Sequence, residues 1–302
     1  MTGRLVHTGQ VVIDLVMRVP ALPPAGGDVL ASDTSTHAGG GFNVMAAAAR
    51  SGASVLYTGG HGRGPHGDLT RAALAAEGIA VAQPMAEQDT GVCVVLVDDT
   101  GERTFVTGSG AETAVAGALP AVSAADVVYV SGYSLLVPAK AEQILALSGG
   151  AVLVDPGPLA AEIEPGLWAR MLSRTCVLSC NAREARLLSG EPDPARAGLA
   201  LGRRLRDEAV VLVRDGAAGC LLVRGGEVEH VPGVRVEAVD TNGAGDAHCG
   251  VLAAELLRGA TVPEAARRAN AAAALAVTRP GPATAPTRAE LDAFLTTHPT
   301  PT

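Results

Sequence analysis

The amino-acid sequence predicts an α/β protein, with a mostly parallel central sheet covered by helices on both faces and a small second sheet beside it. Short apolar runs rich in β-branched residues alternate with Ala- and Leu-rich runs of helical period along most of the 302 residues. That alternation is typical of a parallel sheet covered on both sides. Two segments break the alternation, which indicates strands outside the main sheet. We therefore expect one large α/β domain over residues 1–302.

The strands of the main sheet are predicted at the short apolar runs. These are residues 5–9, 54–58, 127–130, 151–154, 176–178 and 210–213, with a further strand-like run at 234–239. The helices are predicted at residues 43–50, 69–77, 139–147, 182–188, 195–206, 247–257, 263–277 and 288–295. Gly, Pro or Asn near most of these limits supports them.

The two segments that read as extended are residues 15–37 and 90–106. In the second, apolar residues flank the turn sequence Asp98-Asp99-Thr100-Gly101, a pattern that predicts a hairpin. Together the segments predict a small sheet that acts as a lid and excludes water from a site. Such a sheet can also pair between subunits, so a homodimer through the lid is one expectation. An edge extension of the main sheet with no gating role is the alternative.

Composition excludes several classes of function. The net charge of −8 argues against a nucleic-acid or membrane partner, and aromatic residues make up only 2%, which leaves few platforms for stacking bases. No apolar run approaches the roughly 20 residues of a membrane helix, and the N-terminus lacks a signal-peptide pattern, so we expect a cytoplasmic protein. The five cysteines are scattered, which is typical of free thiols in a reducing compartment.

The most informative stretch is residues 240–246, Asp-Thr-Asn-Gly-Ala-Gly-Asp, which leads into a predicted helix. Small residues there let backbone N–H groups converge on an anion, and the helix dipole favours negative charge. A carboxylate at Asp246 suits a base that accepts a hydroxyl proton while the amides steady a transferring phosphoryl group. Lys140 is the only lysine and no Gly-Lys-Ser/Thr loop is present, so ATP would need such a different cradle. A glycine turn capped by an acidic residue is the alternative.

This stretch resembles the D-T-x-G-A-G-D signature of the ribokinase-like (PfkB) carbohydrate and nucleoside kinases, and the resemblance extends over nearly the whole chain. It implies a ribokinase-like fold with a β-sheet lid over the substrate, and ATP and Mg²⁺ as cofactors. It also implies that Asp246 is the catalytic base and that the amides of Gly243, Ala244 and Gly245 form the anion hole.

The expected substrate residues lie near the N-terminus. Residues 38–43, Ala-Gly-Gly-Gly-Phe-Asn, resemble the family's G-G-x-x-x-N sugar motif, with Ala38 at its first Gly, and this places Gly39, Gly40 and Asn43 at the substrate. Asp14 follows Gly9 by the family's spacing for a carboxylate that binds sugar hydroxyls, as a carboxylate can accept two such donors. Ribokinases proper have Asn where Val12 stands, which argues against ribose itself. A glycine hinge with Asn43 as a helix cap is the alternative.

The expected nucleotide residues lie in the C-terminal half. Asn181-Ala182-Arg183-Glu184 resembles the N-x-x-E motif, which implies that Asn181 lies near the phosphates and Glu184 near Mg²⁺, through a water as Mg²⁺ prefers. The spacing also fits a plain capping box. Residues 213–219 resemble the T-L-G-x-x-G turn beside ATP, with Gly216 and Gly219 at its glycines. Arg214 stands in place of the usual Thr, where it either contacts a phosphate or is a solvated charge. Asn270 matches a family position near the nucleotide.

The resemblance also extends to a monovalent-cation loop. Its residues here are Asp240, Asn242, Arg279 and Gly281. The resemblance thus implies K⁺ as a further candidate cofactor.

Three other patterns in the sequence offer rival interpretations. Residues 62–67, Gly-Arg-Gly-Pro-His-Gly, satisfy G-x-G-x-x-G with Glu87 beyond them, which formally predicts a dinucleotide site. A strand and helix precede this unit, however, and the kinase family has a glycine turn in the same place. Metal sites at His61 and His66, or at Cys176 and Cys180, are less favoured than turn or core residues. His248 is interpreted as a packed residue that could also tune Asp246.

The sequence therefore predicts an ATP- and Mg²⁺-dependent kinase that phosphorylates a hydroxyl of a small sugar or sugar-like alcohol. A nucleoside kinase of the same fold and a sugar-binding regulatory protein that has lost catalysis remain alternatives. Specificity is expected to depend on lid residues near Arg103 and on Ser131-Gly132-Tyr133.

Overall fold

The main sheet of the computed structural model has nine strands in the order β13-β12-β11-β10-β9-β8-β1-β4-β5. The structure describes residues 3–114 and 117–298. From β11 to β5 each neighbouring pair of strands is parallel, whereas β12 and β13 extend the sheet as an antiparallel hairpin. The strands are β1 (Leu5–His7), β4 (Val55–Tyr57), β5 (Ala80–Val81), β8 (Val127–Ser131), β9 (Ala151–Asp155), β10 (Val177–Asn181), β11 (Val210–Arg214), β12 (Gly219–Arg224) and β13 (Glu227–Pro232).

Helices cover both faces of this sheet. Alternate strand residues enter two separate apolar cores: Leu5 packs with one and Val6 with the other. The first core is built with α1 (Gly41–Arg50), α2 (Pro65–Ala76), α8 (Ala244–Leu257), α9 (Val262–Val277) and α10 (Arg288–Thr297). The second is built with α3 (Gly132–Leu135), α4 (Pro138–Ala146), α5 (Pro165–Leu172), α6 (Ala182–Ser189) and α7 (Pro194–Gly202). The predicted α/β architecture is confirmed.

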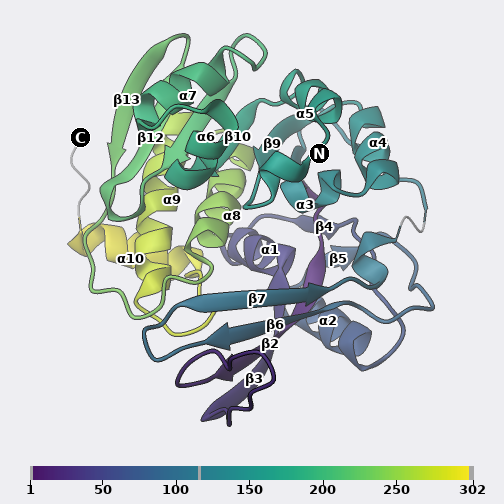
Figure 1. Cartoon of the computed structure of the whole chain (residues 1–302). Helices are drawn as coiled ribbons and strands as arrows, with labels where there is room; N and C mark the ends of the chain where they lie inside the picture. Colours follow the sequence, from purple (N-terminus) through teal and green to yellow (C-terminus); the bar gives the residue numbers. More distant parts are fainter. Residues whose placement is uncertain (1–2, 115–116, 299–302) are drawn as a thin grey trace.

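A second sheet has the order β3-β2-β6-β7 and lies across one side of the molecule (Figure 1). Its strands are β2 (Val11–Arg18), β3 (Asp33–Gly40), β6 (Val92–Val97) and β7 (Arg103–Gly108), and β6 and β7 form the predicted hairpin. We call these four strands the lid sheet. Both extended segments of the sequence contribute to it, so the predicted small sheet is confirmed as separate from the main one.

Two predicted elements differ from the structure. Residues 234–239 are not a strand: the ladder of β13 ends at Pro232, which has no N–H to donate, and the chain then runs to the end of α9, where the Val239 amide donates to the Val277 carbonyl at 2.7 Å. The helix predicted at 195–206 ends at Gly202, because hydrogen bonds beyond it shift to a spacing of three residues. Among the described residues, no helix combines the length and apolar character that crossing a bilayer requires.

Candidate active site

Asp246 and Asn43 meet at the starts of two helices that pack closely. Gly250 lets α8 approach α1, since a Cβ there would lie 2.3 Å from the Val44 carbonyl oxygen. This close packing brings the Asn43 side chain, in the first turn of α1, to the first turn of α8, where its amide donates to the Asp246 carboxylate at 3.0 Å. The two residues are 203 positions apart in the sequence. Two residues predicted from separate motifs therefore form one polar pair.

The Asp246 carboxyl is mostly withdrawn from solvent, and this sets its proton affinity. Burial raises the pKa of Asp246 to about 7, with further upward contributions from Asp155 and Asp14, while the Asn43 hydrogen bond and the Arg214 charge lower it. A carboxyl with a pKa near neutrality is suited to accept a proton at physiological pH. His248 lies two residues on, but burial and then Arg214 lower its pKa to about 3, so it is neutral and packed.

The loop before α8 has the shape of an anion site. Gly243 is the N-cap in the left-handed region (φ 74°), and a Cβ there would lie 1.9 Å from the Pro282 carbonyl oxygen. No other residue type fits this position without a shift of the backbone. The N–H groups of the first helical turn, including Ala244 and Gly245, have no acceptor inside the helix. The Ala244 amide makes only a long contact outside the helix, to the Thr241 carbonyl at 3.4 Å, so this turn could bind a negatively charged group beside Asp246.

The predicted substrate residues lie on the lid sheet. Asp14 of β2 is adjacent to Gly39 of β3, where a Cβ would lie 2.0 Å from the Asp14 carboxylate oxygen, and Gly40 has a positive φ of 60°. Burial raises the pKa of Asp14 to about 6. Gly40 leads directly into α1, where Asn43 contacts the Asp246 carboxylate. The predicted substrate residues and the predicted base are thus joined through the start of α1.

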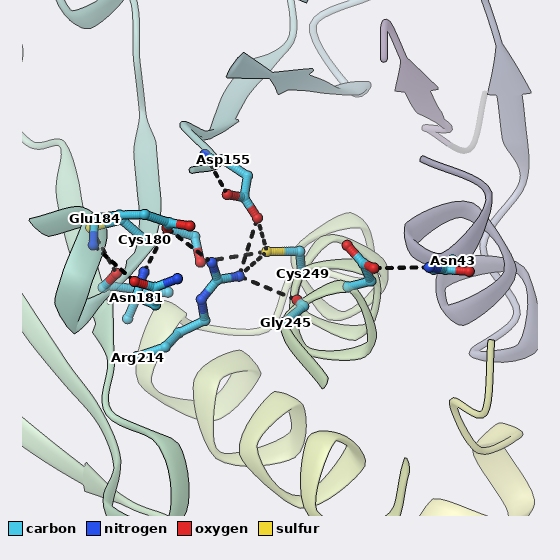
Figure 2. Close-up of polar contacts among 12 residues, drawn as sticks. Asn43, Asp155, Cys180, Asn181, Glu184, Arg214, Gly245 and Cys249 are labelled. Atoms are coloured by element: carbon cyan, nitrogen blue, oxygen red, sulfur yellow. Dashed lines mark hydrogen bonds and ion pairs between the residues drawn. The ribbon is translucent and has the colours of Figure 1, made fainter. Parts of the chain in front are cut away.

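Arg214 connects the carboxyl ends of three parallel strands to α8 (Figure 2). Its guanidinium donates to Asp155 at the end of β9 (3.2 Å), to the Gly245 carbonyl (3.2 Å) and to the Cys249 sulfur (2.9 Å), and lies 3.6 Å from the Glu184 carboxylate. Burial alone would lower the pKa of Arg214, but the acidic groups raise it well above its ordinary value. Arg214 is not the solvated charge that was the alternative; it is a buried counter-ion.

Asn181 and Glu184 form the capping box that the spacing allows. The Glu184 amide donates to the Asn181 side chain at 2.8 Å, and the Glu184 carboxylate accepts from the Asn181 amide at 2.9 Å. Burial, and then the nearby Asp155 carboxylate, raise the pKa of Glu184. The cap places Glu184 beside Asp155 and Arg214. Glu184 therefore both caps α6 and lies at the candidate active site.

Gly216, Gly219 and Asn270 lie around the β11–β12 turn and the end of β13. Gly216 has a positive φ of 54° with open space around it, whereas a Cβ at Gly219 would lie 2.3 Å from the Val231 carbonyl oxygen. Asn270 of α9 donates to the carbonyls of Val231 and Pro232 at 3.0 and 3.2 Å. The side-chain amide of Asn270 therefore stabilises the end of β13 and is already engaged as a donor.

The predicted cation-loop residues have protein partners. The Asp240 carboxylate pairs with Arg103 of β7 and accepts from the amides of Asn242 (2.9 Å) and Gly281 (3.1 Å). Arg279 points elsewhere, to Glu290 at 2.7 Å. Asp240, Asn242 and Gly281 are brought together, and the Arg279 side chain is not.

The rival glycine turn is already filled. The Asp89 carboxylate accepts from the amides of His66 (3.2 Å) and Gly67 (2.8 Å) at the start of α2, where a dinucleotide pyrophosphate would bind. The described part of the chain holds no group of three or more His, Cys, Asp or Glu placed to hold a metal. A groove of about 460 Å³ lies beside the site, between β3, α1, α2 and residues 280–284, rather than at Asp246.

Sequence reasoning missed Asp155, and it named Arg103 only for specificity. A carboxylate directly after the buried strand 151–154 was a usable signal, because ligands of parallel sheets bind beyond the carboxyl ends of the strands. Arg103 carried no such signal, since its partner is 137 residues away.

Comparison with known proteins places this arrangement in one family. The family model "pfkB family carbohydrate kinase" matches residues 2–288. An uncharacterized sugar kinase, YegV, of Escherichia coli is 30% identical over 94% of this chain and 91% of its own. The chain thus belongs to the pfkB family of carbohydrate kinases, and it is an ATP-dependent sugar kinase.

Solved structures agree on the fold. Ribokinase from Thermotoga maritima superposes with a TM-score of 0.84 at 26% identity, covering 98% of this chain and all of its own. Aminoimidazole riboside kinase from Salmonella enterica, solved with aminoimidazole riboside and an ATP analogue, has a TM-score of 0.80 at 27% identity, covering 97% and 100% of the two chains. The ribokinase-like fold with its small lid sheet is therefore confirmed.

Proposed function

We propose that the enzyme transfers the γ-phosphoryl group of ATP to a primary hydroxyl of a small sugar or sugar-like alcohol, with Asp246 as the base. The observation that carries this proposal is the partly buried Asn43–Asp246 pair at the first turn of α8. The hydroxyl proton passes to the Asp246 carboxylate as the oxygen–phosphorus bond forms in line, and the bond to the departing ADP oxygen breaks. The pKa of about 7 lets the carboxylate accept that proton near neutral pH.

The acceptor and the phosphoryl group are held by different elements. Asp14, Gly39, Gly40 and Asn43 lie on the lid side and would bind the acceptor hydroxyls. Amides of Gly243, Ala244 and Gly245 would bind the charge that develops on the phosphoryl oxygens, and one such donor is typically worth about 10²–10³ in rate. Positioning and electrostatics carry the reaction, since little covalent chemistry is required of the protein.

We assign the nucleotide side to Asn181, Glu184, Gly216 and Gly219, with Asn270 holding the backbone of Val231 and Pro232 beside them and Arg214 holding the acidic groups in place. Glu184 and Asp155 offer the oxygen donors that Mg²⁺ takes, and their number suits an ion that keeps most of its waters. When bound, Mg²⁺ neutralises charge on the phosphates. Glu184, held by its cap and by Arg214, would orient a water of that ion.

A nucleoside kinase is the second candidate. It is favoured by the riboside kinase of Salmonella enterica, which shares the fold and was solved with a riboside bound. The scarcity of aromatic residues, 2% of the chain, weighs against a stacked base.

The deciding experiment is ADP release with MgATP across sugars, sugar acids, phosphosugars and nucleosides, for the wild type and Asp246→Asn. We expect one class of acceptor to support turnover and Asp246→Asn to lose at least about 10³ of it while binding ATP normally. Undiminished turnover in the variant would remove Asp246 from the mechanism. ATP binding and sugar binding without turnover on any acceptor would favour the regulatory alternative.

A further inference from the structure

The Asp240 carboxylate joins three segments that are far apart in the sequence. One oxygen pairs with Arg103 of the lid sheet and accepts from the Asn242 amide at 2.9 Å; the other accepts from the Gly281 amide at 3.1 Å. The side chains are 21% exposed for Arg103 and 11% for Asp240, so the pair is largely shielded from water. Shielded pairs of this kind are screened little by salt.

The same junction supports the anion-hole loop. Asp240 precedes that loop, and its own amide and that of Val239 donate to the Val277 carbonyl at 3.0 and 2.7 Å. Gly243 lies against Pro282, where a Cβ would lie 1.9 Å from the carbonyl oxygen. A shift of Asp240 would therefore displace the loop that carries Gly243.

The Asp240 carboxylate already has a cationic partner in Arg103, and this partner excludes a monovalent cation while it is present. A cation would have to bind the carboxylate oxygen that pairs with the guanidinium, whereas the two backbone N–H groups at the carboxylate carry no net charge and would leave Asp240 unbalanced without Arg103. Arg279 carries a further positive charge and is paired with Glu290 at 2.7 Å. A second cation beside Arg103 would be repelled by it.

We propose that the Arg103 guanidinium takes the place of a monovalent cation at Asp240, so that the lid itself holds the anion-hole loop in its working shape. Arg103 is thus a positioning residue, and the enzyme needs no K⁺. The expected effect of Arg103 on turnover rests on the proposed function. Its expected effect on whether the folded protein is stabilised by K⁺ is independent of that function.

The lid sheet makes this contact part of acceptor binding. Arg103 pairs in register with Val97 of β6, and β6 pairs in register with β2, which carries Asp14. Register also places Asp14, Val97 and Arg103 on one face of that sheet, because side chains two residues apart along a strand share a face. One rigid sheet therefore connects the acceptor carboxylate to the anion-hole loop.

The test compares wild type, Arg103→Met, Arg103→Lys and a matched control, Arg18→Met, in KCl, NaCl and choline chloride at equal ionic strength. Arg18 is exposed and lies in the same row of the lid sheet as Val97 and Arg103, with no ion pair found in the described part of the chain. The first readout is the midpoint of thermal unfolding, which needs no acceptor. The second is turnover with MgATP and an acceptor from the panel.

We expect wild type, Arg103→Lys and Arg18→Met to behave alike in all three salts. Arg103→Met should lose at least about fivefold in turnover in choline chloride, regain it in KCl, and unfold at a higher temperature in KCl than in choline chloride. Adding Asp240→Asn to Arg103→Met should abolish the response to K⁺.

A wild type that is stabilised or activated specifically by K⁺ would overturn the proposal, and so would an Arg103→Met variant that does not respond to K⁺. If Arg103→Met does not fold, Arg103→Gln and the wild-type salt series decide in the same way. If no acceptor supports turnover but Arg103→Met unfolds at a higher temperature specifically in KCl, the proposed function is contradicted and the inference about Arg103 is supported.

Discussion

At the scale of single residues, the site depends on how Asp246 is kept near the boundary between its protonated and ionised forms. Burial disfavours the carboxylate, whereas one amide donor from Asn43 and the charge of Arg214 favour it. Neither opposing group is a sequence neighbour of Asp246: one comes from α1 and the other from the end of β11. The proton affinity of the base is thus a property of the packed site.

The first prediction concerns pH. Because the base acts only when deprotonated, kcat/KM should rise with pH through an apparent pKa of about 7 and level off above it. Asn43→Ala removes the donor that stabilises the carboxylate, so the same limb should move to higher pH, as a pH–rate profile would measure. If the rising part of the pH–rate profile stays at the same pH in Asn43→Ala, Asn43 does not influence the pKa of Asp246.

The raised pKa has a matching cost in stability. Since the folded state holds the Asp246 proton up to about pH 7, whereas an ordinary Asp loses it near 3.8, the folded protein loses stability as pH rises between these values. Asp246→Asn should therefore be more stable than wild type at pH 8, by up to about 4 kcal/mol, and by less at pH 5. Urea unfolding at the two pH values measures this, and equal differences at both would contradict it.

At the scale of elements, the proposed base and the proposed anion site both lie in the first turn of α8. Its start is fixed by Gly243, whose left-handed conformation and contact with Pro282 admit no side chain. Arg214 then ties Gly245 in that turn to the ends of β9 and β10 through Asp155 and Glu184. The helix start is therefore held on two sides.

Gly243→Ala tests this arrangement against Gly190→Ala. Both glycines have similar φ values, 74° and 77°, but a Cβ at Gly190 meets nothing within 4 Å. Gly190→Ala should cost about 1–2 kcal/mol of stability and leave turnover unchanged. Gly243→Ala should cost more and lower turnover at least about 100-fold. Equal behaviour of the two variants in urea unfolding and turnover would show that the Pro282 contact does not shape the loop.

At the scale of the whole molecule, the lid sheet presents an open edge. β7 is the last strand of that sheet, and its Phe105 and Val106 are 56% and 64% exposed. Exposed apolar edge strands tend to pair with another chain. We therefore propose a homodimer in which two lid sheets associate.

Light scattering after size exclusion tests the dimer. Wild type should have twice the mass of the chain, and Val106→Lys should be a monomer, because a charge on an edge opposes strand pairing. Val228→Lys is the matched control, since Val228 is an exposed valine on β13, the outer edge of the main sheet. A monomeric wild type, or a dimer lost equally in both variants, would reject association through the lid.

Much of this architecture followed from local pattern. Parallel strands and their covering helices have periods that the sequence displays, and the lid hairpin was marked by its turn residues. Residues 234–239 look like a strand by the same rule, yet within residues 3–114 and 117–298 no strand pairs with them. The β12–β13 hairpin was overlooked because its outer strand is exposed and polar at several positions.

The sequence by itself determined the α/β order, the lid segments and the motif that carries Asp246, because each depends on residues close together along the chain. Only the tertiary structure decided the partners: Asn43 on Asp246, Arg214 between Asp155 and Glu184, and Arg103 on Asp240. The burial and the electrostatic environment of a site depend on groups from many elements. The spacing of those groups along the chain does not predict how close they lie in space. The pKa of the base and the partner of Asp240 are therefore properties of the fold.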